Sequence, residues 1–128
     1  ILDLAADPHR SLDFVTDQVG SPTVAGDAAA ALAGLVERRW VGLVHIANDG
    51  QASCYELAQR VLRAAGHDPD RVRQVTTADL RPAQRAARPA FSALDTSLLR
   101  SLGIDLPRWE DAVDAFVGDF VAASSRTA

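Results

Sequence analysis

Lysine and methionine are both absent from this chain of 128 residues, and cysteine occurs once, as Cys54. All 13 basic residues are therefore arginines, which excludes a Schiff-base lysine, a lysine general base and a P-loop lysine. One cysteine cannot form an internal disulfide. Because the chain has no methionine and starts in the middle of an amphipathic stretch at Ile1, we expect it to be a fragment of a longer polypeptide.

Long apolar runs and a large excess of one charge are also missing. No run approaches the roughly 20 residues of a membrane-spanning helix, and no signal-peptide pattern opens the chain. The net charge of −4 gives no long-range attraction for nucleic acid or anionic lipid. We therefore expect no nucleic acid and no membrane as partners, and we take the cytoplasm as the default location.

Apolar residues at helical spacing predict three main helices. Residues 27–39 form an alanine-rich stripe that starts at Asp27, whose carboxylate suits the first turn of a helix. Residues 53–65 open with a capping box of Ser53 and Glu56 and end before Gly66. Residues 109–120 repeat apolar side chains over three turns. Shorter helices are expected over residues 1–6 and 96–102. The stripe of the first main helix consists of Ala28, Ala31, Leu32, Leu35 and Val36.

Apolar runs without that spacing predict strands at residues 12–16, 41–47 and 72–76, and the run 41–47 is expected to be buried. A turn follows it and ends at Gly50, where a positive φ is expected. Residues 79–89, which include Arg81, Arg85 and Arg88, are expected to form a loop. The order of elements indicates an α/β fold, a mostly helical lobe with a few short strands that leans on a partner domain.

The residue types that usually carry catalysis form no recognisable set. The three histidines have no metal-ligand spacing, so no metal site is expected. His45 alternates with apolar neighbours, which favours a hydrogen-bonded, partly buried side chain over a catalyst. Cys54 stands at a helix start, where a thiol pKa can fall, but no histidine partner is recognisable. Tyr55 is expected to serve in packing.

Two polar stretches are the candidates for a binding site. Residues 17–23 read Asp-Gln-Val-Gly-Ser-Pro-Thr and join a strand to a helix, a place where a turn can present polar groups to a ligand. Arg88 beside Pro89 offers a guanidinium, which matches diphosphate oxygens with paired donors. From these residues alone, an ordinary turn and a solvated basic loop are the simpler explanations.

Five segments follow one another in a familiar order and spacing: residues 15–23 (Val-Thr-Asp-Gln-Val-Gly-Ser-Pro-Thr), 42–48, 53–58, 88–96 and 106–109. Together they resemble the C-terminal half of the dTDP-4-dehydrorhamnose reductases, which are extended short-chain dehydrogenase/reductases. The resemblance covers nearly the whole chain. The first motif is moderately specific, and the ordered set is strong because several unlinked matches must coincide.

The resemblance implies that residues 1–128 are the substrate-binding part of an enzyme that reduces the 4-keto group of dTDP-6-deoxy-L-lyxo-4-hexulose to dTDP-L-rhamnose with NADPH or NADH. In that family, an N-terminal Rossmann half holds the cofactor and supplies a catalytic tyrosine and lysine, and the C-terminal half closes over the nucleotide sugar. The resemblance assigns substrate binding to seven residues. These are Gln18, Gly20, Ser21, Pro22 and Thr23 near the sugar, and Arg88 and Ser92 toward the diphosphate or nucleotide.

The chain departs from the family pattern in two ways, since it has neither the glycine-rich cofactor motif nor the Tyr-x-x-x-Lys dyad. Its one tyrosine, Tyr55, is followed four residues later by Gln59. We therefore expect this segment alone to bind no nicotinamide cofactor and to transfer no hydride. Its expected partners are a dTDP-sugar nucleotide and the N-terminal Rossmann domain, and homodimer formation is left open.

Two alternatives also remain open at the level of the sequence. One is a non-catalytic relative similar to the regulatory subunit of methionine adenosyltransferase, which has the same reductase-like architecture. In that case the arginines and prolines of residues 81–89 would serve a protein partner. The other is a small interaction domain that folds and acts by itself.

Overall fold

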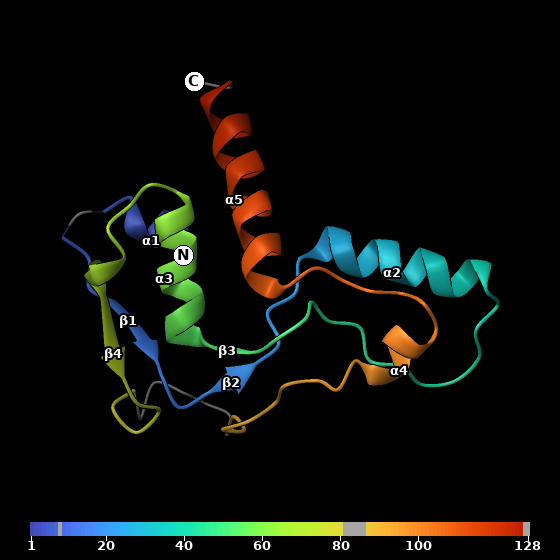
Figure 1. Cartoon of the computed structure of the whole chain (residues 1–128). Helices are drawn as coiled ribbons and strands as arrows, with labels where there is room; N and C mark the ends of the chain where they lie inside the picture. Colours follow the sequence, from blue (N-terminus) through green and yellow to red (C-terminus); the bar gives the residue numbers. More distant parts are fainter. Residues whose placement is uncertain (8, 81–86, 127–128) are drawn as a thin grey trace.

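Helices and short strands make up the computed structural model, which describes residues 1–7, 9–80 and 87–126 (Figure 1). The elements are α1 (Leu2–Ala5), β1 (Leu12–Val15), β2 (Val19–Gly20), α2 (Ala25–Glu37), β3 (Ala52–Ser53), α3 (Cys54–Ala64), the 3-10 turn η1 (Pro69–Arg71), β4 (Val72–Val75), α4 (Ser97–Ser101) and α5 (Trp109–Ser125). The predicted α/β lobe, mostly helical with few short strands, is thereby confirmed. Part of the predicted loop 79–89, including Arg81 and Arg85, lies outside the described residues.

The strands of the described chain pair into two small sheets. β1 runs parallel to β4, with Leu12 opposite Val72 and Val15 opposite Val75. β2 runs antiparallel to β3, with Val19 opposite Ser53. Because Ser53 is also the N-cap residue of α3, the second sheet holds the polar stretch 17–23 beside the start of that helix.

Buried apolar side chains gather in three clusters of the described chain. The first lies between α3 and the β1–β4 sheet, the second between α3 and α5, and the third between α2 and α4. Figure 1 shows α3 between the β1–β4 pair and α5, with α2 and α4 on the other side of α5. The fully buried members of the first are Leu12, Ala58 and Leu62. The β1–β4 sheet thus covers one side of α3 and α5 covers another. Because α3 is held on both sides, the residues of its first turn have a fixed position.

Local signals set the ends of α3 as predicted. The Ser53 hydroxyl oxygen accepts a hydrogen bond from the Glu56 amide at 3.1 Å, and Glu56 Oε2 accepts one from the Ser53 amide at 2.7 Å. This reciprocal pair satisfies amides that the first turn leaves without helical partners. After the helix, Gly66 adopts φ +76°, a left-handed conformation that glycine tolerates best.

The helix predicted over 27–39 is present, but its start and its buried face differ from the prediction. α2 begins at Ala25 and no side chain caps it through its own N-cap residue, Val24. Asp27 instead accepts a hydrogen bond from the side-chain amide of Asn48 at 2.8 Å. Of the predicted stripe, Ala31 and Leu35 are buried, whereas Leu32 and Val36 are 55% and 68% exposed.

The prediction of a buried strand at residues 41–47 is wrong for this chain. The segment has no regular secondary structure, and the side chains of Val41 and Leu43 are 91% and 84% exposed. His45 is also exposed, with its Nδ1 atom 3.2 Å from the carbonyl oxygen of Asp95. A strand exists only beside another strand, and no described segment lies alongside this one as a partner.

Candidate functional site

A pocket of about 420 Å³, which we name the motif pocket, lies between the stretch 17–23, the first turn of α3 and the segment 88–94. Six of the seven residues expected at a substrate site line it: Gln18, Gly20, Ser21, Pro22, Arg88 and Ser92. The rest of its wall consists of Val19, Ala52, Ser53, Cys54, Leu57, Pro89 and Leu94. The fold therefore brings together two polar stretches that are far apart in the sequence.

Backbone pairing along β2 holds the two stretches together. The Val19 amide donates to the carbonyl oxygen of Ala90 at 2.9 Å, and the Ser92 amide donates to the carbonyl oxygen of Val19 at 2.8 Å. These bonds form a parallel bridge between Val19 and Phe91. β2 thus lies between β3 on one edge and residues 90–92 on the other, which fixes the position of Arg88 relative to the motif.

Both serines of the expected site help to build the pocket. Ser21 Oγ accepts a hydrogen bond from the Leu94 amide at 3.0 Å, and Ser92 Oγ donates one to the Val19 carbonyl oxygen at 3.2 Å. A Cβ atom at Gly20 would stand 3.4 Å from Ser92 Oγ, so the backbone of β2 runs close beside the Ser92 side chain. The hydroxyl groups are therefore already used in holding the segment 88–94 against the motif.

Thr77 positions the polar side chains at the start of the motif. Gln18 Nε2 donates to Thr77 Oγ1 at 2.9 Å, and that hydroxyl donates to Asp17 Oδ1 at 2.8 Å. The Thr77 amide also donates to Asp17 Oδ1, at 2.9 Å. The sequence analysis missed Thr77. The signal that could have found it is the parallel pairing of β1 with β4, which brings the C-terminal ends of both strands to one edge.

Arg88 and Gln18 offer the groups in the motif pocket that remain open to a ligand. Arg88 is exposed and forms no ion pair within the described chain, so its charge can meet an anion. A guanidinium suits the paired oxygens of a phosphate. The side-chain oxygen of Gln18 has no hydrogen-bond donor among the described residues and can accept one from a hydroxyl group.

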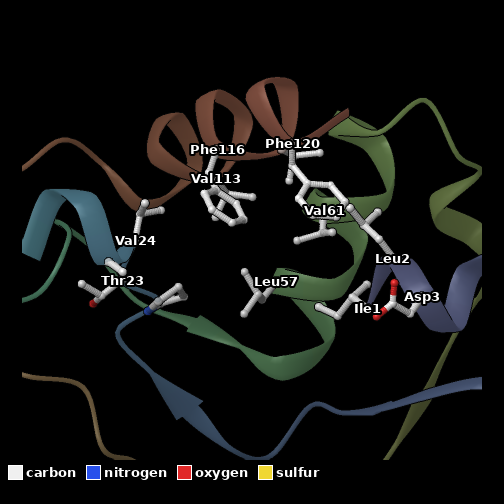
Figure 2. A pocket seen from close by; sticks show the side chains of 13 residues that line it. Ile1, Leu2, Asp3, Thr23, Val24, Leu57, Val61, Val113, Phe116 and Phe120 are labelled. Atoms are coloured by element: carbon white, nitrogen blue, oxygen red, sulfur yellow. The ribbon is translucent and has the colours of Figure 1, made fainter. Parts of the chain in front are cut away.

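Thr23 lines a second, apolar pocket of about 450 Å³ instead of the first. Figure 2 shows Phe116 and Phe120 from α5 facing Leu57 and Val61 from α3 across this space, with Thr23 at one end. The Thr23 hydroxyl donates to the Ser21 carbonyl oxygen at 3.0 Å. Pro22 and Leu57 line both pockets, so the two spaces share one wall.

The residues present do not fit a nicotinamide cofactor. The chain has no lysine and no glycine-rich strand–turn–helix motif. Tyr55 is half-buried and packs against the first core cluster, as expected for a structural side chain. The described residues contain no group of three or more His, Cys, Asp or Glu side chains placed to bind a metal ion. None of the described helices has both the length and the apolar character needed to cross a bilayer.

Comparison with known proteins assigns the family. The sequence profile of the RmlD substrate binding domain matches residues 1–122. The chain belongs to the RmlD substrate binding domain family. The resemblance noted from the ordered motifs is therefore confirmed.

Two curated relatives illustrate the position of the family in larger proteins. A probable dTDP-4,6-dihydroxy-2-methyloxan-3-one 4-ketoreductase of Streptomyces antibioticus is 38% identical over 115 residues, which are 88% of this chain and 38% of that protein. A dTDP-4-dehydrorhamnose reductase of Mycolicibacterium smegmatis is 36% identical over 117 residues, which are 90% of this chain and 35% of that protein. The chain thus spans little more than a third of these relatives.

Solved structures share the fold of this RmlD-type domain. The dTDP-4-dehydrorhamnose reductase of Bacillus anthracis, crystallised with NADP, superposes with a TM-score of 0.73 at 30% identity, over 82% of this chain and 37% of that one. The reductase of Clostridium acetobutylicum gives a TM-score of 0.80 at 26% identity, over 91% of this chain and 40% of that one. The shared region is thus less than half of either solved chain.

Proposed function

We propose that this chain is the substrate-binding part of an NAD(P)H-dependent dTDP-4-dehydrorhamnose reductase. In this proposal it holds dTDP-6-deoxy-L-lyxo-4-hexulose while a Rossmann half, which carries the cofactor, reduces the 4-keto group to give dTDP-L-rhamnose. The observation that carries the proposal is the motif pocket of a chain in the RmlD substrate binding domain family, in which residues 18–22 and Arg88 line one space. A cytoplasmic location and a homodimer stay predictions.

The roles of individual residues follow from their free groups. Arg88 would bind the diphosphate, because its guanidinium is exposed and unpaired within the described chain and can donate two parallel hydrogen bonds. The side-chain oxygen of Gln18 would accept a hydrogen bond from a sugar hydroxyl. Gly20, Ser21, Pro22 and Ser92 would shape the pocket around the ligand, and Thr23 would act from the neighbouring apolar pocket.

The test joins this chain to the part of the Mycolicibacterium smegmatis relative that it does not match, and follows NADPH oxidation with the 4-keto sugar nucleotide. We expect turnover by the joined protein and none by the 128-residue chain. A folded joined protein that bound the cofactor but left this substrate unreduced would overturn the proposal.

Arg88→Gln tests the binding role within the same protein. We expect the KM for the nucleotide sugar to rise about 10-fold to 100-fold, because hydrogen bonds to charged groups contribute about 1.5–3 kcal/mol. Arg63→Gln is the matched control, since Arg63 is an exposed arginine of α3 that lines neither pocket. Equal KM values for the two variants would remove Arg88 from the site.

The regulatory alternative predicts a different outcome for the same joined protein. It would bind a synthetase partner and show no turnover of a sugar nucleotide. The reductase names of the relatives reported above favour the enzymatic role over this alternative.

A further inference from the structure

The side chains of Asp17, Thr77 and Gln18 form a chain of hydrogen bonds that ends at the motif pocket. The Thr77 hydroxyl oxygen lies between the other two, 2.8 Å from Asp17 Oδ1 and 2.9 Å from Gln18 Nε2. Gln18 lines the motif pocket, whereas Asp17 and Thr77 line neither of the two pockets reported for the described residues. Any effect of Asp17 on the hydrogen bonds offered to a ligand there therefore passes through Gln18.

The positions of the protons in this chain follow from the chemistry of its groups. A carboxylate only accepts hydrogen bonds, so Asp17 accepts the single proton of the Thr77 hydroxyl. The Thr77 oxygen then has no proton left to donate and can only accept, which requires the NH2 group of Gln18 on this side. Because the NH2 group and the oxygen are the two ends of the amide, the Gln18 oxygen is turned away from Thr77.

Backbone contacts hold the three residues in this arrangement. The Thr77 amide donates to both carboxylate oxygens of Asp17, at 2.9 and 3.0 Å, so the amide and the hydroxyl of one residue fix the place of the carboxylate. The Cys54 amide, in the first turn of α3, donates to the Gln18 carbonyl oxygen at 3.3 Å. Both the backbone and the side chain of Gln18 are therefore tied down.

We propose that Asp17 is a positioning residue that sets the polarity of the Gln18 side-chain amide, so that the motif pocket presents a hydrogen-bond acceptor to the sugar of its ligand. This role rests on the proposed function, which brings a nucleotide sugar to the pocket. An acceptor pairs with a sugar hydroxyl, which has a proton to donate. It does not pair with the 4-keto oxygen, which is itself an acceptor. A hydroxyl group of the sugar therefore points toward Gln18, and the keto group points away from it.

Without the carboxylate the polarity of Gln18 is no longer fixed. In Asp17→Ala the Thr77 hydroxyl is free to turn its proton toward Gln18, and the amide can then rotate so that its oxygen accepts this proton. The rotated amide presents its NH2 group to the pocket and places a donor where the sugar hydroxyl donates. The variant thus loses a hydrogen bond to the sugar although no residue of the pocket wall has changed.

The test compares the affinities of the joined protein for dTDP-L-rhamnose and for dTDP, which lacks the rhamnose ring, by titration calorimetry. Asp17→Ala should weaken the binding of dTDP-L-rhamnose relative to dTDP by about fivefold, the usual worth of one hydrogen bond. The ratio of the two affinities is the readout, because the lost charge acts on the diphosphate of both ligands alike. A ratio equal to that of the parent would overturn the role of Asp17.

Asp13→Ala is the matched control, because it removes the same charge from the same part of the chain. Asp13 lies on β1, pairs with Arg73 and lines neither pocket. Its loss should lower the melting temperature and leave the ratio of the two affinities as it is in the parent. A change of the ratio as large as that in Asp17→Ala would mean that any loss of charge or stability here has this effect, and would overturn the role of Asp17.

A double-mutant cycle shows whether Asp17 acts through Gln18. In a Gln18→Ala background, Asp17→Ala should leave the ratio of affinities unchanged, since the side chain that it positions is already gone. A further loss in the double variant, equal to the loss that Asp17→Ala causes alone, would mean that the two residues act independently. That result would overturn the positioning role.

NMR of the joined protein without ligand separates this role from the proposed function. The side-chain NH2 protons of Gln18 should show nuclear Overhauser effects to the Thr77 methyl group, and Asp17→Ala should weaken them. Unchanged effects would overturn the role of Asp17, even in a protein that reduces the sugar nucleotide. Weakened effects in a joined protein that binds neither ligand would support the control of Gln18 by Asp17 and count against the proposed function.

Discussion

The side-chain amide of Asn48 donates a hydrogen bond to the carboxylate of Asp27 at 2.8 Å. Its oxygen accepts one from the Val24 amide at 2.8 Å, and its nitrogen also reaches the Pro107 carbonyl oxygen at 3.2 Å. Asn48 is 1% exposed, so these bonds are made away from water. One side chain thereby ties the start of α2, which has no cap of its own, to the residue two positions before α5.

Asn48→Ala should lower the free energy of unfolding by about 2–3 kcal/mol, because it removes the hydrogen bonds of a side chain that is 1% exposed and leaves the part-buried Val24 amide without its partner. Urea unfolding measures the effect. Gln51→Ala is the control, since Gln51 is exposed and has no hydrogen bond within the described chain; it should stay within about 0.5 kcal/mol of the parent. A change of similar size in both variants would contradict a bridging role for Asn48.

Local features of the chain could be predicted from the sequence, and long-range ones could not. The capping box of Ser53 and Glu56 and the glycine after α3 depend on neighbours within a few residues, so their pattern is enough. Asp27 looked like a helix cap by the same logic. It bonds instead to Asn48, 21 residues away, and no spacing rule connects the two. Residues 41–47 have the composition of a strand, but a strand forms only with a partner, and composition does not say where that partner is.

The same difference between local and long-range features applies to the candidate site. The resemblance named Gln18 and Arg88, and the fold brings both to one pocket. It did not name Thr77, which holds Gln18 from 59 residues away through the pairing of β1 with β4. It also could not separate Thr23 from its neighbours, because the chain passes from the motif pocket to the apolar pocket at Pro22, which lines both, and spacing does not show this.

Thr77→Val should weaken the binding of the nucleotide sugar by about fivefold, because losing one hydrogen bond of about 1 kcal/mol frees the Gln18 side chain from its position. Titration calorimetry with dTDP-L-rhamnose, on the joined protein, gives the value. Thr77→Ser keeps the hydroxyl and should restore binding. Because a purely structural role would change stability alone, the melting temperatures of both variants are measured beside the affinities. If the Thr77→Val and Thr77→Ser variants bound the nucleotide sugar with equal affinity, Thr77 would not be a positioning residue.

Asp13 should titrate at an unusually low pH. The Arg73 guanidinium opposite it on β4 and then the Ser11 hydroxyl donate hydrogen bonds to its carboxylate and lower its pKa to about 2. A carboxylate with a lowered pKa contributes stability above its unfolded pKa of about 3.9 and loses that contribution as the pH falls through its folded value. The pair should therefore stabilise the fold above about pH 4 and lose its effect on the way to pH 2.

An NMR titration of the Asp13 carboxyl carbon tests this pairing. Arg73→Gln should raise the pKa of Asp13 part of the way to its ordinary value, because the Ser11 hydroxyl still donates. High salt should act in the same direction, since the pair lies at the surface. Arg63→Gln should leave the pKa unchanged. An unaltered pKa in Arg73→Gln would mean that β1 and β4 are not in this register.

Gly50 and Gly118 should respond to alanine with opposite signs. Gly50 has φ +97°, and a Cβ atom there would stand 2.9 Å from Cδ1 of Trp109, which is buried at the start of α5. Gly50→Ala should therefore lower the free energy of unfolding by more than about 1 kcal/mol, because the backbone would be strained and the added methyl group would overlap the Trp109 ring.

Gly118 lies inside α5 with nothing within 4 Å of an added methyl group. Gly118→Ala should raise the stability by about 0.5–1 kcal/mol, because glycine loses more backbone entropy in a helix. Urea unfolding of the two variants compares the same chemical change at a required and at a dispensable glycine. Losses of equal size would contradict the left-handed turn that holds residues 48–50 against α5.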